Sequence, residues 1–183
     1  DLAKRASRFR THGITKDANQ LADSNIGPWW YEQHDLGFNY RLTDLQAALG
    51  AHQLSKLEGF IKRRREIAAW YDAALGGLDG MEIPGRRSNV VPGWHLYVVR
   101  TMDPGIRRPL FEQLRAQGIG VQVHYLPVHW HPYYQRLGYA RGLCPIAEGF
   151  YSRSISLPIF PSISETDFHY VVEKLESVMQ VLK

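Results

Sequence analysis

The sequence contains a single cysteine and no long apolar run. Cys144 has no partner for an internal disulfide, which agrees with a reducing compartment. No stretch of about 18 apolar residues suggests a membrane span, and no charged-then-apolar leader suggests export. We therefore expect a cytoplasmic protein in which Cys144 is a small packed residue.

Neither positive nor negative charge is in large excess. The net charge is +4 at pH 7, and the one dense basic run, Lys62 to Arg65, is flanked by Glu58 and Glu66. We interpret this run as the solvated face of a helix. Nucleic-acid binding is not expected, because basic residues are not interleaved with exposed aromatic ones.

The sequence also lacks P-loop, GxGxxG, zincin and GxSxG patterns, which excludes the commonest nucleotide-binding and hydrolase motifs.

Apolar residues make up 44% of the 183 residues, which is enough for the core of a globular domain. After an opening helix and a loop from about 13 to 40, helical spacing predicts one long helix from Asp44 to about Leu75. Such a helix would be roughly 48 Å long, so we expect it to bridge two domains. The glycine-rich segment 76–80 ends it.

Short strands and helices alternate beyond residue 93. We expect strands over 95–101, 120–125 and 154–157, and helices over 107–117, 145–153 and 164–182. Pro145 suits the first turn of a helix, and Ser164 with Asp167 forms a capping pair. This pattern predicts a small α/β unit.

The segment Gly37 to Gly50, GFNYRLTDLQAALG, combines a polar turn with a helix start. Thr43 and Gln46 have the spacing of a capping box, so a helix begins there. Just before it, Asn39, Tyr40 and Arg41 offer an amide, a phenol and a guanidinium, which suit an anionic ligand. A polar loop that simply leads into a helix is the alternative.

Three histidines, His124, His129 and His131, lie within the segment HYLPVHWHPYY, beside Tyr125. Metal binding is one interpretation, but no carboxylate or thiol lies close in sequence to complete a four-ligand shell. A polar loop with packed aromatic rings and a wall of an active site are the other two interpretations, and all three remain open on this evidence.

A third candidate is the aromatic run Trp29, Trp30 and Tyr31, which follows Gly27-Pro28. After a Gly-Pro turn, these rings could stack on a uracil or pack against the faces of a sugar. The alternative is that they are buried anchors of a loop.

Several motifs, taken in order, resemble the DegT/DnrJ/EryC1/StrS family of sugar aminotransferases. They are HGITKD, GPWWYEQ, GFNYRLTD, HYLPVHWHPYY and CPIAEGFYSRSISLPIFP, and the resemblance runs from His12 to the last helix. Within that family, the sequence is most similar to the UDP-sugar 4-aminotransferases of pseudaminic acid biosynthesis.

The resemblance implies an α/β fold: the C-terminal portion of a fold-type I aminotransferase that depends on pyridoxal phosphate. Residues 1–42 would be a remnant of the large cofactor domain with an active-site loop, 43–75 a long interdomain helix, and 76–183 a small C-terminal α/β domain. The lysine that carries the cofactor would precede Asp1, since none of the six lysines present has the family's setting. We therefore expect no catalytic residue in this chain and no activity of the chain alone.

The resemblance also implies roles for particular residues. Asn39 would bind the cofactor phosphate across a homodimer, with Arg41 near it. Tyr40, His124, Tyr125, Trp30 and Tyr31 would contact a nucleotide-sugar substrate, and no metal site is implied. The reaction would move an amino group from an amino acid, glutamate in most relatives, to a UDP-4-keto-6-deoxy sugar. A non-catalytic dimerisation or regulatory module, or part of a pyridoxal-dependent sugar dehydratase, are the alternatives.

Overall fold

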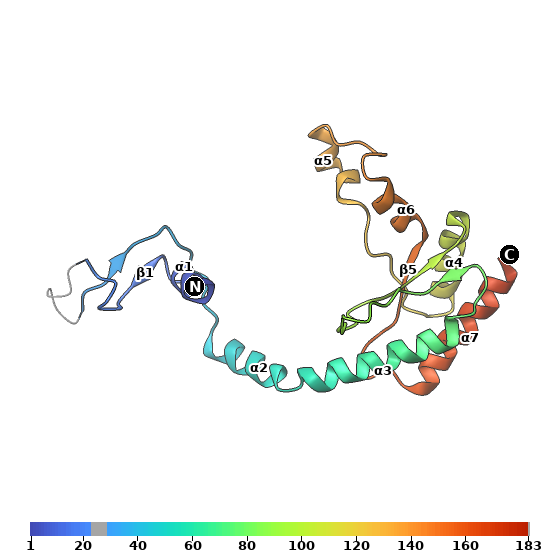
Figure 1. Cartoon of the computed structure of the whole chain (residues 1–183), viewed down its shortest axis with the longest axis horizontal. Coiled ribbons are helices and arrows are strands. Elements are labelled where there is room, and N and C mark those ends of the chain that lie inside the picture. The colour runs from blue at the N-terminus through green and yellow to red at the C-terminus, as the bar shows by residue number, and fades with distance from the viewer. Residues whose placement is uncertain (23–28, 183) are drawn as a thin grey trace. The chain divides into compact units, whose positions relative to one another are not determined.

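The computed structural model describes residues 1–22 and 29–182, which form two compact units, 1–55 and 56 onward (Figure 1). This division differs from the three segments expected from the sequence, and the boundaries of those segments stay a prediction.

The first unit contains helix α1 (Leu2–Phe9), a pair of short antiparallel strands, β1 (Ile14–Thr15) and β2 (Glu32–Gln33), and helix α2 (Asp44–Leu54). The Asp1 side chain caps α1 by accepting a hydrogen bond from the backbone N–H of Ala3 at 3.0 Å. The sequence predicts a loop where β1 and β2 lie, because strands of two residues leave no periodic signal.

The prediction of a single long helix over 44–75 is wrong. Helix α2 ends at Leu54, and a second helix, α3 (Leu57–Leu75), begins after Ser55 and Lys56. The start of α2 is confirmed, since Thr43 Oγ1 accepts from Gln46 N–H at 3.3 Å while Gln46 Oε1 accepts from Thr43 N–H at 3.0 Å. The end of α3 at Gly76 is also as expected.

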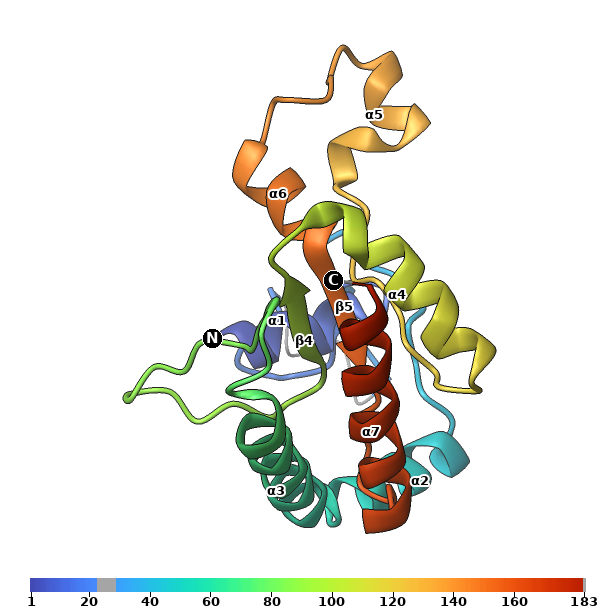
Figure 2. The ribbon, with the colours of Figure 1, turned by 90° about the vertical axis from the view of Figure 1, so that its right-hand side faces the viewer.

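The second unit is built on a three-stranded antiparallel sheet in the order β3 (Met81–Glu82), β4 (Tyr97–Thr101), β5 (Ser154–Leu157). Helix α4 (Pro104–Ala116) packs against β4 and β5, and α7 (Glu165–Val181) packs against α4 and α3 (Figure 2). Between α4 and β5 the chain makes an excursion through η1 (Val128–Trp130), α5 (Pro132–Arg136) and α6 (Pro145–Arg153).

Most of the predicted elements of this unit are confirmed, but the strand over 120–125 is not. It is reduced to one bridge, in which Gln122 and Ser156 exchange both backbone hydrogen bonds, at 3.2 and 2.7 Å. Beyond Gln122 the chain leaves the sheet toward Pro127, which cannot donate to a ladder.

Two stacked tyrosines join α3 to the sheet. The rings of Tyr71 and Tyr97 lie 4.8 Å apart, and both residues are fully buried. Burial raises the pKa of both phenols, so each hydroxyl keeps its proton and acts as a donor. Tyr71 Oη donates to the carbonyl of Pro158 at 2.9 Å, and Tyr97 Oη donates to Asp72 Oδ1 at 2.8 Å. These bonds satisfy polar groups that would otherwise be costly to bury.

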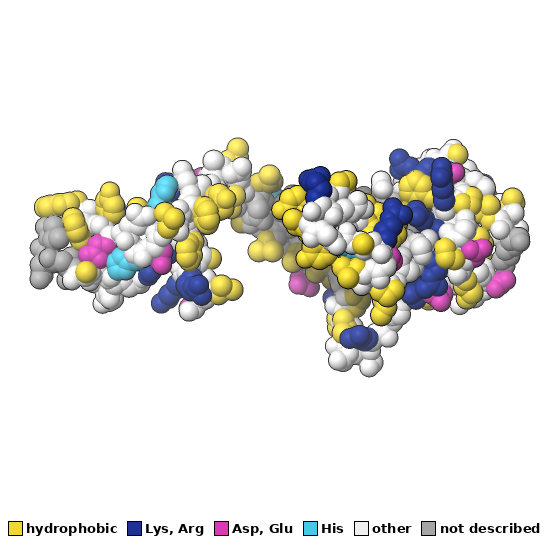
Figure 3. Space-filling model, turned by 90° about the horizontal axis from the view of Figure 1, so that it is seen from above, with side chains coloured by type: hydrophobic (Ala, Val, Ile, Leu, Met, Phe, Trp, Pro, Cys, Tyr) yellow, Lys and Arg dark blue, Asp and Glu magenta, His cyan; other side chains and the backbone are white. Residues whose placement is uncertain are grey.

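Large apolar side chains lie on the surface of both units (Figure 3). In the first unit every residue of α2 is exposed, including Leu45 and Leu49. In the second unit Tyr133, Leu137 and Ile146 are exposed on the excursion. None of the helices that the structure describes has both the length and the apolar character that a membrane span requires.

The sequence suggested that the basic run of α3 is a freely solvated face, but Arg64 and Arg65 of this run donate hydrogen bonds to backbone carbonyls. Arg64 donates to the carbonyls of Ile159 at 2.8 Å, Trp94 at 3.1 Å and His95 at 3.4 Å. Its neighbour Arg65 donates to one carbonyl, that of Pro92, at 3.1 Å. Charged donors of α3 thus hold two connecting segments that are far from α3 in sequence.

This arrangement predicts a large difference between two neighbouring arginines. Arg64→Met should lower the free energy of unfolding by roughly 1.5–3 kcal/mol, because three carbonyls lose a charged donor in a partly buried place. Arg65→Met is the control and should cost less than about 1 kcal/mol, because its single contact is exposed. Urea unfolding of both variants measures the difference. Equal losses would contradict the structural role of Arg64.

Candidate functional site

An extended segment, 37–41, docks against the end of α1 in the first unit. Phe38 N–H donates to the Phe9 carbonyl at 2.6 Å, and Tyr40 N–H donates to the Arg10 carbonyl at 3.0 Å. In return, His12 N–H donates to the Phe38 carbonyl at 2.9 Å. These backbone bonds fix the segment that immediately precedes the cap of α2.

Two glycines permit this docking. A Cβ atom on Gly37 would lie 2.3 Å from the backbone nitrogen of Gly13. A Cβ atom on Gly13 would lie 1.8 Å from the carbonyl oxygen of Asp35, and Gly13 has φ +73°. No side chain fits at either position, because the obstructing atoms belong to the backbone.

Three polar side chains meet on one face of the segment, two from the segment itself and one from His12. Arg41 Nε donates to Asn39 Oδ1 at 2.9 Å, and a terminal nitrogen of Arg41 lies 3.0 Å from His12 Nε2. Among the described residues, no carboxylate pairs with Arg41, and the NH2 group of Asn39 makes no hydrogen bond. The three side chains therefore present a cationic, donor-rich surface that suits a phosphate oxygen.

Tyr40 lies on the opposite face. Side chains alternate along an extended backbone, so Phe38 and Tyr40 share one side while Asn39 and Arg41 share the other. The rings of Phe38 and Tyr40 stack 4.9 Å apart at 10°. The structure thus separates Tyr40 from the two residues with which the sequence grouped it, and its substrate role stays a prediction.

The aromatic residues Trp29, Trp30 and Tyr31 are exposed and do not pack as buried anchors within this chain. Trp30 Nε1 donates to Glu32 Oε1 at 3.1 Å, and the Lys16 ammonium lies 5.9 Å from the centre of the Tyr31 ring. The Gly27-Pro28 turn lies outside the described residues. Contact of Trp30 and Tyr31 with a base or a sugar stays a prediction.

In the second unit, the bridge at Gln122 brings His124 over β5. His124 Nδ1 lies 2.8 Å from Ser156 Oγ, so a hydroxyl of the sheet orients the imidazole. The Tyr125 ring packs edge-on against the imidazole, with the two ring centres 4.5 Å apart, and Tyr125 remains 69% exposed. An oriented imidazole beside an exposed phenol can form one wall of a binding site.

The other two histidines have different surroundings. His129 is buried, and its Nε2 lies 2.7 Å from Glu148 Oε1, whereas His131 is exposed. Glu148 also accepts from the backbone N–H of Gly142 at 2.8 Å and of Cys144 at 3.3 Å. Across the described ranges 1–22 and 29–182, no three His, Cys, Asp or Glu side chains converge as metal ligands do.

Sequence reasoning missed Glu148 because it lies 19 residues beyond His129. Its only local signal is an acidic residue in the first turn of a helix that Pro145 opens. The expectation that Cys144 is packed is wrong, since Cys144 is exposed at the N-cap position of this helix and its side chain makes no capping hydrogen bond.

The contacts of Glu148 predict a pH dependence of stability. The hydrogen bond from His129 is the main cause that lowers the pKa of Glu148 below its ordinary value of 4.5, with smaller contributions from Gly142 and Cys144, and burial opposes them. A carboxyl whose pKa is lowered by folding stabilises the fold above that ordinary value, and this contribution is lost as the pH falls through the lowered pKa.

We therefore expect the gap in unfolding free energy between the unmodified protein and Glu148→Gln to shrink from about pH 5 to about pH 3. Urea unfolding across this range measures the gap. Glu173→Gln serves as the control, because Glu173 is an exposed partner of Lys174 on α7. A gap that widens toward acid would show that Glu148 is not held as a carboxylate.

Comparison with known proteins shows which family this chain belongs to. The family model described as the DegT/DnrJ/EryC1/StrS aminotransferase family matches residues 1–176. The spore coat polysaccharide biosynthesis protein SpsC of Bacillus subtilis is 37% identical over 185 residues, which cover 98% of this chain and 47% of SpsC. The chain spans about half the length of the curated relatives it matches.

Solved structures agree with this assignment. Spr1654 from Streptococcus pneumoniae, in its PMP form, matches with a TM-score of 0.85 and 27% identity, covering 100% of this chain and 46% of that one. PseC from Helicobacter pylori, an aminotransferase involved in the biosynthesis of pseudoaminic acid, matches with a TM-score of 0.84 and 26% identity, covering 98% and 46%.

The fold is that of the C-terminal part of pyridoxal phosphate-dependent aminotransferases. The chain belongs to the DegT/DnrJ/EryC1/StrS aminotransferase family.

Proposed function

We propose that this chain is the C-terminal part of a pyridoxal phosphate-dependent nucleotide-sugar aminotransferase. The enzyme would transfer an amino group from an amino acid, with glutamate as the first candidate, to the keto carbon of a UDP-4-keto-6-deoxy sugar. The family match over residues 1–176 is the observation that carries the proposal.

The residues present fit the phosphate of the cofactor. His12, Asn39 and Arg41 form a cluster without a carboxylate, and Asn39 and Arg41 are exposed. Phosphate oxygens are strong acceptors, and a planar guanidinium beside an amide NH2 group matches them in charge and in hydrogen-bond character. A match to a structure in its PMP form, the aminated state of this cofactor, supports the same assignment.

Pyridoxal phosphate supplies an electron sink for breaking and forming bonds at the amino-bearing carbon. The contribution of this chain is to bind and to orient. Asn39 would donate from its NH2 group to the phosphate of the cofactor held by the partner subunit, and Arg41 would add positive charge beside it. The chain holds no catalytic residue under this proposal, so it would be inactive alone.

Substrate contacts fall to the exposed aromatic residues and to His124. The oriented imidazole of His124 and the exposed phenol of Tyr125 would lie against the sugar. Trp30 and Tyr31 would offer flat faces to the base or the sugar, and Tyr40 would contact the substrate from the apolar side of its segment. PseC is described as an aminotransferase involved in the biosynthesis of pseudoaminic acid, and SpsC as a spore coat polysaccharide biosynthesis protein. These descriptions support a nucleotide sugar as the substrate class.

A homodimer is part of the proposal. Exposed Leu42, Leu45 and Leu49 lie on and just before α2, close in sequence to Asn39. A partner subunit that covers these residues would remove apolar surface from water and bring Asn39 to the partner's cofactor.

The reaction type is tested on the full-length enzyme loaded with pyridoxal phosphate. We expect a visible absorbance band that borohydride removes, and we expect glutamate to convert that band to the one of the aminated cofactor. A band that glutamate leaves unchanged, together with loss of water from the keto sugar, would support the dehydratase instead. No band at all would support the non-catalytic module.

The contact across the dimer is tested with two mutants of the full-length enzyme. Asn39→Ala should weaken cofactor affinity about tenfold to hundredfold, because a charged acceptor loses one hydrogen bond worth roughly 1.5–3 kcal/mol. It should change the unfolding free energy much less, since the Asn39 side chain is exposed.

A mixed dimer then locates the contact. One subunit carries Asn39→Ala and keeps the cofactor lysine, and the other lacks that lysine but keeps Asn39. The one site with a lysine receives Asn39 from the other subunit, so its cofactor affinity should return to normal. If the affinity stays weak, Asn39 acts within its own subunit and the proposed contact is wrong.

A further inference from the structure

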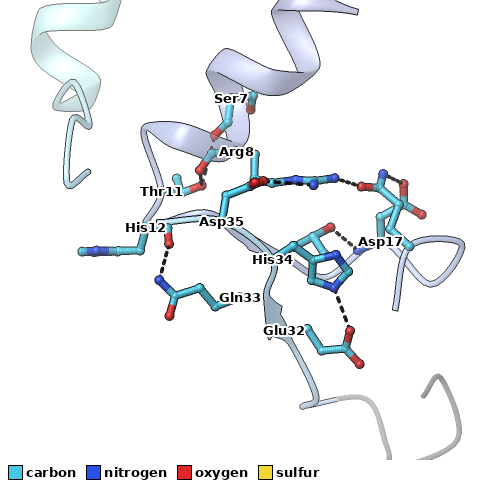
Figure 4. Close-up of polar contacts among 11 residues, drawn as sticks. Ser7, Arg8, Thr11, His12, Asp17, Glu32, Gln33, His34 and Asp35 are labelled. Atoms are coloured by element: carbon cyan, nitrogen blue, oxygen red, sulfur yellow. Dashed lines mark hydrogen bonds and ion pairs between the residues drawn. The ribbon is translucent and has the colours of Figure 1, made fainter. Parts of the chain in front are cut away.

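His12 occupies an unusual backbone position beside the phosphate-binding residues. Its φ is +62°, in the left-handed region that a residue other than glycine rarely adopts. Both of its backbone groups are engaged: the N–H donates to Phe38 at 2.9 Å, and the carbonyl accepts from Gln33 Nε2 at 2.9 Å. Figure 4 shows the imidazole of His12 pointing away from the polar network around Arg8 and Asp35.

The contact with Arg41 fixes the tautomer of His12. A guanidinium can only donate, so His12 Nε2, 3.0 Å from Arg41, must be the acceptor. The proton of the neutral imidazole is then on Nδ1. His12 thus offers Arg41 a lone pair, which an aliphatic residue could not supply.

The same reasoning orients Asn39. Arg41 Nε donates to the side-chain amide of Asn39 at 2.9 Å, so the amide atom nearest to Arg41 is the oxygen. This contact occupies the acceptor end of the amide and leaves the NH2 group for an anion. His12, Arg41 and Asn39 therefore form a chain of contacts that ends in a correctly turned donor.

We propose that His12 is a positioning residue for the phosphate site, acting on Asn39 through Arg41. This inference rests on the proposed function. By holding the guanidinium in one orientation, His12 reduces the conformational entropy that Arg41 would lose on ligand binding. The left-handed backbone at residue 12 places the imidazole where it can do this.

The test compares two substitutions that tolerate the backbone at residue 12. His12→Gly accepts a positive φ and removes the acceptor, whereas His12→Asn also tolerates that φ and restores a carbonyl acceptor. Affinity for pyridoxal phosphate is measured by equilibrium dialysis on the full-length enzyme, alongside unfolding in urea. We expect His12→Gly to weaken affinity roughly twofold to tenfold, and His12→Asn to recover part of the loss.

A double-mutant cycle separates positioning from a general structural effect. In an Arg41→Met background, His12→Gly should have no further effect on cofactor affinity, because the contact it removes is already gone. Gln33→Ala is the control, since it removes only the bond to the His12 carbonyl, and it should leave affinity unchanged. An undiminished effect of His12→Gly without Arg41, or no effect with it, would overturn the proposal.

Asn39→Ala distinguishes this inference from the proposed function. If Asn39→Ala weakens cofactor binding but His12→Gly does not, the phosphate site stands and the positioning role of His12 is wrong. If Asn39→Ala itself has no effect, there is no donor for His12 to position, and both the phosphate role of Asn39 and the positioning role of His12 are wrong, whereas the proposed reaction type is tested separately by the absorbance of the loaded enzyme.

Discussion

The polar cluster depends on one close backbone contact, where Gly37 lies against Gly13. A methyl group at residue 37 would approach the nitrogen of Gly13 to 2.3 Å, so only glycine fits. This contact lets the extended segment 37–41 pair with the end of α1, and that pairing sets the alternation of its side chains. Asn39 and Arg41 face one way, and Tyr40 faces the other.

In the second unit, charged side chains hold connecting segments by bonding to their backbone. Arg64 donates to three carbonyls from two segments, and Glu148 accepts from two N–H groups on the excursion before α6. Loops that lack a ladder of their own gain fixed partners in this way. His124 is held in a different way, because its Nδ1 lies 2.8 Å from Ser156 Oγ on the sheet.

Elements with a strong local signal could be predicted from the sequence. The capping box at Thr43 starts α2, Pro145 opens α6, and Ser164 caps α7, as the sequence indicated. The break between α2 and α3 could not be predicted, because Ser55 and Lys56 keep helical backbone angles and leave the apolar spacing undisturbed. The sequence predicts a full strand over 120–125 because these residues suit a strand. It does not show that the pairing is limited to one bridge at Gln122.

The site could be predicted to a limited extent. The sequence groups Asn39, Tyr40 and Arg41 as candidates for an anionic ligand, and the structure brings the side chains of Asn39 and Arg41 together but not that of Tyr40. The partnerships of His12 with Arg41 and of His129 with Glu148 could not be predicted, because they join residues 29 and 19 positions apart. Spacing along a chain carries no record of such contacts.

The central claim is that this chain provides phosphate donors to a cofactor held by another subunit. A crystal structure of the full-length enzyme with pyridoxal phosphate bound tests it most directly. The account predicts Asn39 Nδ2 at about 2.7–3.2 Å from a phosphate oxygen of the partner subunit's cofactor, with Arg41 beside it. A phosphate ligated wholly by other residues, with Asn39 facing solvent, would contradict the account.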